Sequence, residues 1–180
     1  MWHACAAMPA DFITPMAAVA GSVAEELIGC YRAAGIRRAW INNGGDIALH
    51  LAEGESVRVG LVADITRRRT ALDGRFAVQH TDPVRGIATS GWRGRSHSMG
   101  IADSVTVLSA TASGADAAAT VVANAVNVDD ARIRRAPASS LKDDSDLGER
   151  LVTVDVPALP TTLVTQALAR GLRVARELHA

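Results

Sequence analysis

The chain has 180 residues, of which 48 % are hydrophobic, and this is enough for one domain with a buried core. Its 19 basic and 19 acidic residues cancel to a formal net charge of zero, so no strong field favours nucleic acid or an anionic membrane as a partner. No apolar run reaches the roughly 18 residues of a transmembrane helix, and residues 1–10 lack the features of a signal peptide. We therefore expect a cytoplasmic protein that binds neither nucleic acid nor membranes.

The first third of the chain predicts a helix followed by strands. Thr14 and Pro15 are typical of a helix start, apolar residues then recur at helical spacing, and Gly35 would end a helix at 15–34. Gly21 lies inside this helix, which indicates either close packing or a ligand beside the backbone. Short apolar runs separated by glycine-containing turns predict strands at 38–42, 46–51 and 56–62.

The remaining two thirds predict a mixture of strands and helices. Residues 64–75 indicate an exposed loop, in which the run Arg67-Arg68-Arg69 either binds phosphate or, as is commoner, faces solvent. Ser113 would cap the N-terminus of a helix at 113–127, and the polar segment 128–150 would be a surface excursion. The other predicted elements are strands at 75–79, 84–89, 103–109 and 151–156 and a helix at 161–178. This order favours an α+β fold with a mostly antiparallel sheet packed against helices.

The first of three segments with potential chemistry runs from Asn42 to Asp46 and has the sequence Asn-Asn-Gly-Gly-Asp. Paired glycines allow positive φ angles and bring backbone amides close to a ligand. A tight hairpin turn explains the same glycines, although it does not require both Asn residues and Asp46. Both interpretations stay open at this point.

The second segment, residues 88–98, combines hydroxyl groups, glycines, Arg93, Arg95 and His97. Such a loop can donate many hydrogen bonds to an anion, and arginine binds phosphate through two parallel bonds. A polar surface loop is the alternative.

The third segment places Asp116 and Thr120 four residues apart on a helix, so their oxygens face the same way. A carboxylate and a hydroxyl suit a hard cation such as Mg²⁺, which keeps water ligands and shares phosphate oxygens. The alternative is an Asp that interacts with the helix dipole and a Thr that bonds back to its own helix.

Taken in order, the three segments resemble the ApbE-like superfamily, whose characterised members are Mg²⁺-dependent FAD:protein FMN transferases. The similarity spans about residues 12–127 and is nearest to an uncharacterised bacterial and archaeal branch, which residues 145–156 also resemble. The matching motifs are Asn-x-Gly-Gly-acid at 42–46, Ala-Thr-Ser-Gly with a following Arg at 88–93, His97 before Ser-Val-Thr-Val at 104–107, and Ala-Asp-Ala-x-Ala-Thr at 115–120. The resemblance implies a single ApbE-like, T-fold-related domain over 1–180, in which 128–180 is a branch-specific C-terminal part.

The resemblance also implies roles for residues in these motifs. Asp116 and Thr120 would bind Mg²⁺ with the backbone carbonyl of Ala20 as a third ligand, and His97 would be the catalytic residue that assists deprotonation of an acceptor Thr. The acceptor hydroxyl then attacks the FMN phosphorus of FAD and AMP leaves, while the metal and an Arg neutralise the developing charge. The residues that would line the flavin or its diphosphate are Asn42, Asn43, Gly44, Gly45, Asp46, Thr89, Ser90, Gly91 and Arg93.

The chain departs from the family pattern at three places. Gly21 stands where the family usually has Lys, the Asp-Pro-Arg-Thr-Gly loop expected after His97 is missing, and the N-terminal segment that helps to build the flavin pocket has no counterpart. We therefore expect a truncated or reduced member. Two functions stay open: Mg²⁺-dependent transfer of FMN from FAD to a protein Thr, and non-catalytic binding of a flavin or nucleotide. The expected partners are a small phosphorylated ligand (FAD or FMN) and, for a transferase, an acceptor protein, while an uncovered sheet edge leaves a homodimer open.

Overall fold

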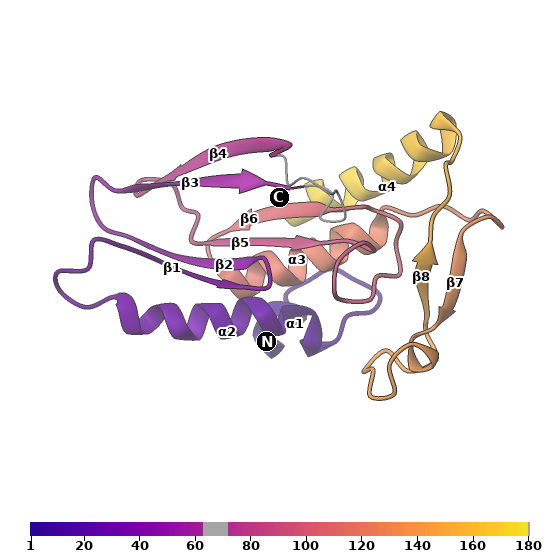
Figure 1. Cartoon of the computed structure of the whole chain (residues 1–180), viewed down its shortest axis with the longest axis horizontal. Helices are drawn as coiled ribbons and strands as arrows, with labels where there is room; N and C mark the ends of the chain where they lie inside the picture. The colour runs from indigo at the N-terminus through magenta and orange to yellow at the C-terminus, as the bar shows by residue number, and fades with distance from the viewer. Residues whose placement is uncertain (63–71, 180) are drawn as a thin grey trace.

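The computed structural model of the chain describes residues 1–62 and 72–179. Residues 64–71 of the predicted loop at 64–75, including Arg67-Arg68-Arg69, therefore lie outside the described residues, and its last two residues already belong to a strand that begins at Gly74. Figure 1 shows the arrangement of the helices and strands. The described elements are α1 (Trp2–Ala6), η1 (Pro15–Ala18), α2 (Val19–Ile28), η2 (Gly29–Tyr31), β1 (Arg38–Asn43), β2 (Asp46–Leu51), β3 (Ser56–Leu61), β4 (Gly74–Gln79), β5 (Gly86–Ser90), β6 (Val105–Ser109), α3 (Ala112–Ala125), β7 (Arg134–Pro137), η3 (Ala138–Ser140), β8 (Leu151–Asp155) and α4 (Thr161–His179).

The strands form one four-stranded sheet and two separate hairpins. The sheet has the order β1-β2-β5-β6, and the hairpins are β3–β4 and β7–β8. Every one of these strand pairs is antiparallel. The prediction of a mixed fold with a mostly antiparallel sheet against helices is thus confirmed.

Small side chains join the helices to one face of the sheet. Ala24 and Ile28 of α2 pack on Ala48 of β2. Further along the sheet, Ala88 of β5 contacts α3 through alanines that are completely buried. Alanine at these positions lets helix and strand backbones approach closely, so α2 and α3 lie side by side beneath the sheet (Figure 1).

The opposite face of the sheet is covered by larger side chains from the β3–β4 hairpin. Leu49 and Ile87 of the sheet form a buried cluster with Val78 of β4. Elsewhere, α4 packs on the C-terminal end of α3, where Gly171 allows contact because a Cβ atom there would lie 2.3 Å from Val126 Cγ2. Two differently built cores therefore enclose the sheet: alanines and Ile28 on the helix side, and larger aliphatic residues on the hairpin side.

The structure corrects several predicted boundaries. The helix predicted at 15–34 is a 3₁₀ turn followed by α2, which ends at Ile28. The side chain of Thr14 does not cap it and instead donates a hydrogen bond to Asp146. The prediction that Ser113 caps the second helix is wrong, because the Thr111 side chain accepts the capping bond from Gly114.

The segment 128–150 is also more ordered than a polar surface excursion. It contains β7, which pairs with β8. Arg134 and Arg135 made this strand hard to predict from the sequence, because the short, half-buried strand that they begin has no continuous apolar pattern. The predicted strands before and after this segment and the final helix are present within one or two residues of their expected ends.

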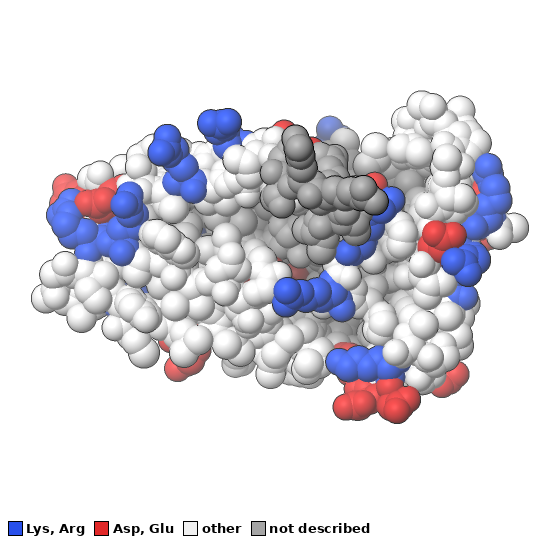
Figure 2. Space-filling view, viewed as in Figure 1, with Lys and Arg blue, Asp and Glu red and all other residues white. Residues whose placement is uncertain are grey.

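Charge is dispersed on one face of the described part of the molecule. On the face drawn in Figure 2, basic side chains stand singly or beside acidic ones, and outside the grey atoms they form no continuous patch of one sign. Across residues 1–62 and 72–179, no helix has both the length and the apolar character needed to cross a membrane.

Candidate functional site

The carboxylate of Asp116 points from α3 at the N-terminus of α2. Its Oδ2 atom accepts a hydrogen bond of 2.9 Å from the backbone N–H of Gly21, and the backbone N–H of Ala20 donates to it as well. The first N–H groups of a helix lack partners within the helix, and Ala18 at the N-cap position has no side chain that could accept from them. Asp116 therefore supplies this cap from a second helix, next to the predicted metal ligand Ala20.

Gly21 makes this contact between the helices possible. A Cβ atom at this position would lie 2.3 Å from the carbonyl oxygen of Ala112 and 2.8 Å from Cβ of Asp116. Such distances are far inside van der Waals contact, so any other residue would push α2 and α3 apart. Of the two interpretations of Gly21, close packing is confirmed.

The β1–β2 hairpin brings two further side chains to the same place. The side-chain amide of Asn43 donates through Nδ2 to the carbonyl oxygen of Ala20, at 3.2 Å. Asp46 lies opposite Asn43 in the strand register, is 9 % exposed, and accepts a bond of 3.2 Å from the backbone N–H of Thr89. We call the group formed by Asn43, Asp46, Asp116 and the Ala20 carbonyl the carboxylate site.

Burial perturbs the pKa of both acids of the carboxylate site, and the charge of Asp46 perturbs that of Asp116 as well. Burial raises the pKa of Asp116, the bond from Gly21 opposes this rise, and the nearby charge of Asp46 adds to it, so that the pKa reaches about 7. Burial also raises the pKa of Asp46, against the effect of the bond from Thr89. Among the described residues, no Lys or Arg forms an ion pair with either carboxylate. The site thus holds two close acids without a basic partner from that part of the chain.

The donor atoms of the carboxylate site suit a hard divalent cation. Carboxylate, carbonyl and hydroxyl oxygens are the ligands that Mg²⁺ prefers, together with water. Thr120 lies one turn beyond Asp116 on α3 and is half-buried, where its hydroxyl could add another oxygen. The described residues contain no group of three or more His, Cys, Asp and Glu side chains that could hold a metal. A cation here would therefore depend on the carbonyl, the hydroxyl and water as well as the two carboxylates.

The glycines of the β1–β2 turn serve the hairpin itself. Gly44 and Gly45 have φ angles of 71° and 117°, as the two central residues of a type I′ turn require. The side chain of Asn42 accepts a bond of 2.9 Å from the backbone N–H of Gly45 and is otherwise exposed. The hairpin interpretation is thus confirmed for these three residues, whereas Asn43 and Asp46 face α2 and α3.

The segment after β5 is held together largely by its own contacts. Gly91 is required because a Cβ atom would lie 2.4 Å from the carbonyl oxygen of Asp103. Asp103 also accepts bonds from Arg93 Nε at 2.6 Å and from Trp92 Nε1 at 3.1 Å, and the Arg93 guanidinium lies over the Trp92 ring. Thr89 connects this segment to the carboxylate site through its backbone, while Ser90 is half-buried at the end of β5.

His97 does not join the carboxylate site through any described contact. The side chain is half-buried, and its ring makes no hydrogen bond within the described residues. The next residue, Ser98, donates to Asn124 near the C-terminal end of α3. Since Asn124 follows Asp116 by two turns of helix, the two positions are separated by roughly 12 Å along the axis.

The sequence analysis did not assign structural roles to two acids, Glu25 and Asp103. Glu25 of α2 accepts bonds from the backbone N–H and the hydroxyl of Ser113, at 2.9 and 2.6 Å. Asp103 anchors Arg93 and Trp92. The closeness of Asp46 to Asp116 was missed as well. These residues lie far apart in the sequence, and no local spacing reveals their pairing, although the hydrophobic alternation of β2 does place Asp46 on the same face as Ala48.

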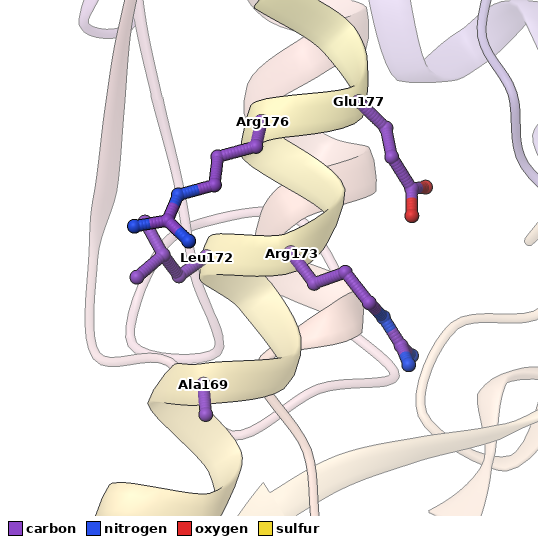
Figure 3. Close-up of a pocket in the computed structure, with 5 residues that line it drawn as sticks. All are labelled: Ala169, Leu172, Arg173, Arg176 and Glu177. Atoms are coloured by element: carbon purple, nitrogen blue, oxygen red, sulfur yellow. The ribbon is translucent and has the colours of Figure 1, made fainter.

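The structure also has a shallow hollow on the outer side of α4. It is lined by Ala169, Leu172, Arg173, Arg176 and Glu177. Figure 3 shows that Arg176 and Leu172 point to one side of the helix, whereas Arg173 and Glu177 point to the other. Because these side chains do not converge on one point, the carboxylate site is the better candidate for chemistry.

Comparison with known proteins places the chain in a family. The model of the family described as AbpE bacteria matches residues 1–180. The chain is 36 % identical over 169 residues to a UPF0280 protein of Methanoregula boonei, covering 90 % of this chain and 69 % of the relative. It is 38 % identical over 124 residues to a UPF0280 protein of Methanoculleus marisnigri (67 % and 49 %), and 42 % identical over 118 residues to one of Methanothermobacter thermautotrophicus (64 % and 43 %).

The chain spans about half the length of the last two relatives that it matches. The name UPF0280 protein states no activity, so these relatives show which proteins the chain is related to but not which reaction it catalyses. The family model matches the whole chain, and the match to the Methanoregula boonei relative covers more than two thirds of both proteins. The chain therefore belongs to the AbpE bacteria family, an ApbE-related family.

Proposed function

We propose that this protein binds a flavin nucleotide, FAD or FMN, together with Mg²⁺ at the carboxylate site. The observation that carries the proposal is the close, largely buried pair of Asp46 and Asp116. Two neighbouring carboxylates repel each other and lose hydration on burial. A divalent cation would offset both costs and would lower the pKa of each acid.

Mg²⁺ bound at this site would supply positive charge to the phosphate group of a ligand, because it keeps coordination positions that water or phosphate can fill. The residues that would hold it are Asp116, Asp46 and the Ala20 carbonyl, with Thr120 one turn away. The hairpin turn and the end of β5 adjoin the site, since Asp46 contacts Thr89. Membership of an ApbE-related family and the resemblance of the motifs support a flavin nucleotide as the phosphorylated ligand.

A second, finer function is transfer of FMN from bound FAD to a Thr of another protein. It is favoured by the resemblance of the motif around His97 to that of the family's catalytic histidine. The P–O bond to FMN would form from the acceptor hydroxyl as AMP leaves. The anchoring of Ser98 away from Asp116 and the pairing of Arg93 with Asp103 favour binding without transfer.

Binding is tested with FAD fluorescence polarisation in Mg²⁺ and in EDTA, on the wild-type chain and on Asp116→Asn. The substitution removes a charge but keeps an oxygen that can accept from Gly21, so the fold should persist, which circular dichroism would check. We expect FAD affinity at least tenfold lower in EDTA and in Asp116→Asn. Asp129→Asn, the same change at an exposed position, should match the wild type. FAD binding that is absent, or equal in Mg²⁺ and EDTA, would contradict the proposal.

Transfer is tested by incubating the protein with FAD, Mg²⁺ and a Thr-containing acceptor peptide. Release of AMP together with a peptide adduct of FMN mass would establish the transferase, and His97→Gln should then abolish both signals while FAD binding remains. FAD binding without AMP release would identify a binding protein that does not transfer FMN.

A further inference from the structure

Asn43, at the end of β1, lies between α2 and Asp46. Ala39 and Ile41 pack toward α2, and strand alternation places Asn43 on the same face. Its side-chain amide meets the Ala20 carbonyl at 3.2 Å, and its partner in the strand register is Asp46. The resemblance assigned Asn43 to the flavin, whereas the geometry directs it to the same carbonyl that would bind Mg²⁺.

The distance between Asn43 and Ala20 is that of two ligands of one cation. Oxygen ligands of Mg²⁺ at about 2.0–2.1 Å and at right angles lie about 2.9 Å from each other. The 3.2 Å between Asn43 Nδ2 and the Ala20 oxygen is close to this value. A half-turn of the amide would exchange its nitrogen for Oδ1 without moving the rest of the side chain.

The orientation of the amide should therefore depend on the cation. Without a cation, N–H must face the Ala20 carbonyl, because two facing oxygens would repel. With a cation between them, both groups can present oxygen. We infer that Asn43 is a cation ligand of the carboxylate site through Oδ1, an inference that rests on the proposed binding of Mg²⁺ there.

Asn42 provides a matched control one residue away. It faces the opposite side of β1, is exposed, and accepts from Gly45 through Oδ1. Asn42→Asp keeps that acceptor and adds the same charge as Asn43→Asp. A difference between the two variants therefore reports the local position of the carboxylate and not the change in net charge.

The test is a titration with Mn²⁺ alone, followed by electron paramagnetic resonance of the free ion, with Mg²⁺ as competitor. Because charged ligands strengthen cation binding, Asn43→Asp should bind Mn²⁺ about tenfold more tightly than the wild type. In EDTA, the same variant should unfold at a lower temperature than the wild type, since it adds a third acid beside Asp46 and Asp116. Asn42→Asp should show neither effect.

A second measurement needs no substitution in the protein that is titrated. Mg²⁺ should shift the side-chain ¹⁵N–¹H₂ signals of Asn43 in the wild-type spectrum, while those of Asn42 stay in place. Each pair of signals is assigned by its loss in the corresponding Asp variant, or in Asn43→Leu if Asn43→Asp does not fold.

The outcomes separate the inference from the proposed function. If the wild type binds Mn²⁺, but Asn43→Asp binds no more tightly or the Asn43 signals do not move, Asn43 is a structural donor and the inference is overturned while the cation site stands. Equal gains in Asn43→Asp and Asn42→Asp would also overturn it. A wild-type protein that binds neither Mn²⁺ nor Mg²⁺ overturns the proposed function and the inference together.

Discussion

The carboxylate site and the loop from Gly91 to His97 look equally promising as sequence, but they are built differently. At the carboxylate site, two largely buried acids face helix backbone without a basic partner from the described residues. In the loop, Arg93 already has an acid within 2.6 Å and a ring beneath it. Within the described residues, the acids of the first region thus lack an opposite charge, whereas the arginine of the second region has one.

This difference shows what makes a polar cluster a candidate site. The loop is rich in groups that bind phosphate, yet Asp103 and the neighbouring backbone use several of them. The carboxylate site contains fewer polar groups, but the close approach of α2 and α3 holds them in place. Pre-organisation by packed backbone, more than the number of polar residues, distinguishes it.

The largest expected effect comes from separating α2 and α3. Gly21→Val should destabilise the protein by more than about 3 kcal/mol, because the new side chain would overlap the Ala112 carbonyl, which is backbone and has little room to move. The free energy of unfolding in urea would measure this. Gly29→Val is the control, since a Cβ at Gly29 meets nothing within 4 Å. Equal stability of the two variants would contradict the tight packing at Gly21.

A smaller effect is expected in the pH dependence of the free energy of unfolding. The folded pKa of Asp116, about 7, lies above its ordinary value of 3.8, so the folded state holds a proton that the unfolded chain releases. Stability in the absence of divalent cations should therefore be highest below pH 4 for this group and fall by about 2 kcal/mol as the pH rises to about 7, after allowance for solvent screening.

Urea unfolding at pH 5, 6, 7 and 8 in EDTA tests this expectation against Asp116→Asn, in which the fall should shrink. Added Mg²⁺ should flatten the wild-type profile as well, because a bound cation favours the charged carboxylate. An identical pH profile for the wild type and the variant would show that Asp116 is not the source.

The smallest effect is expected in the loop. Arg93→Ala should change the free energy of unfolding by less than about 1 kcal/mol, because its pair with Asp103 is solvent-exposed and such pairs contribute little. Arg95→Ala, at an exposed neighbouring position, should change it even less. A loss above 2 kcal/mol for Arg93→Ala, measured in the same urea assay, would show that the loop is as firmly built as the carboxylate site.

Local patterns in the sequence were sufficient for most elements of the fold. Alternation and turn residues placed β2 at its observed ends, and the pair Gly44-Gly45 marked the hairpin that follows β1. Local patterns did not predict features that depend on a contact between residues far apart in the sequence. Thr111 and Ser113 are both good capping residues, but the helix begins at Ala112 with Thr111 as its cap, and Ser113 instead donates to Glu25, 88 residues earlier.

The same division applies to the site. The sequence by itself supplied the candidate groups, since the small residues of the first helix, the Asn-Asn-Gly-Gly-Asp turn and the pair Asp116 and Thr120 can be identified from the chain alone. The tertiary structure decided which of these groups meet. It joined Asn43, Asp46 and Asp116 at the N-terminus of α2 and anchored the residue after His97 elsewhere, because contacts between distant segments depend on how helices and strands pack.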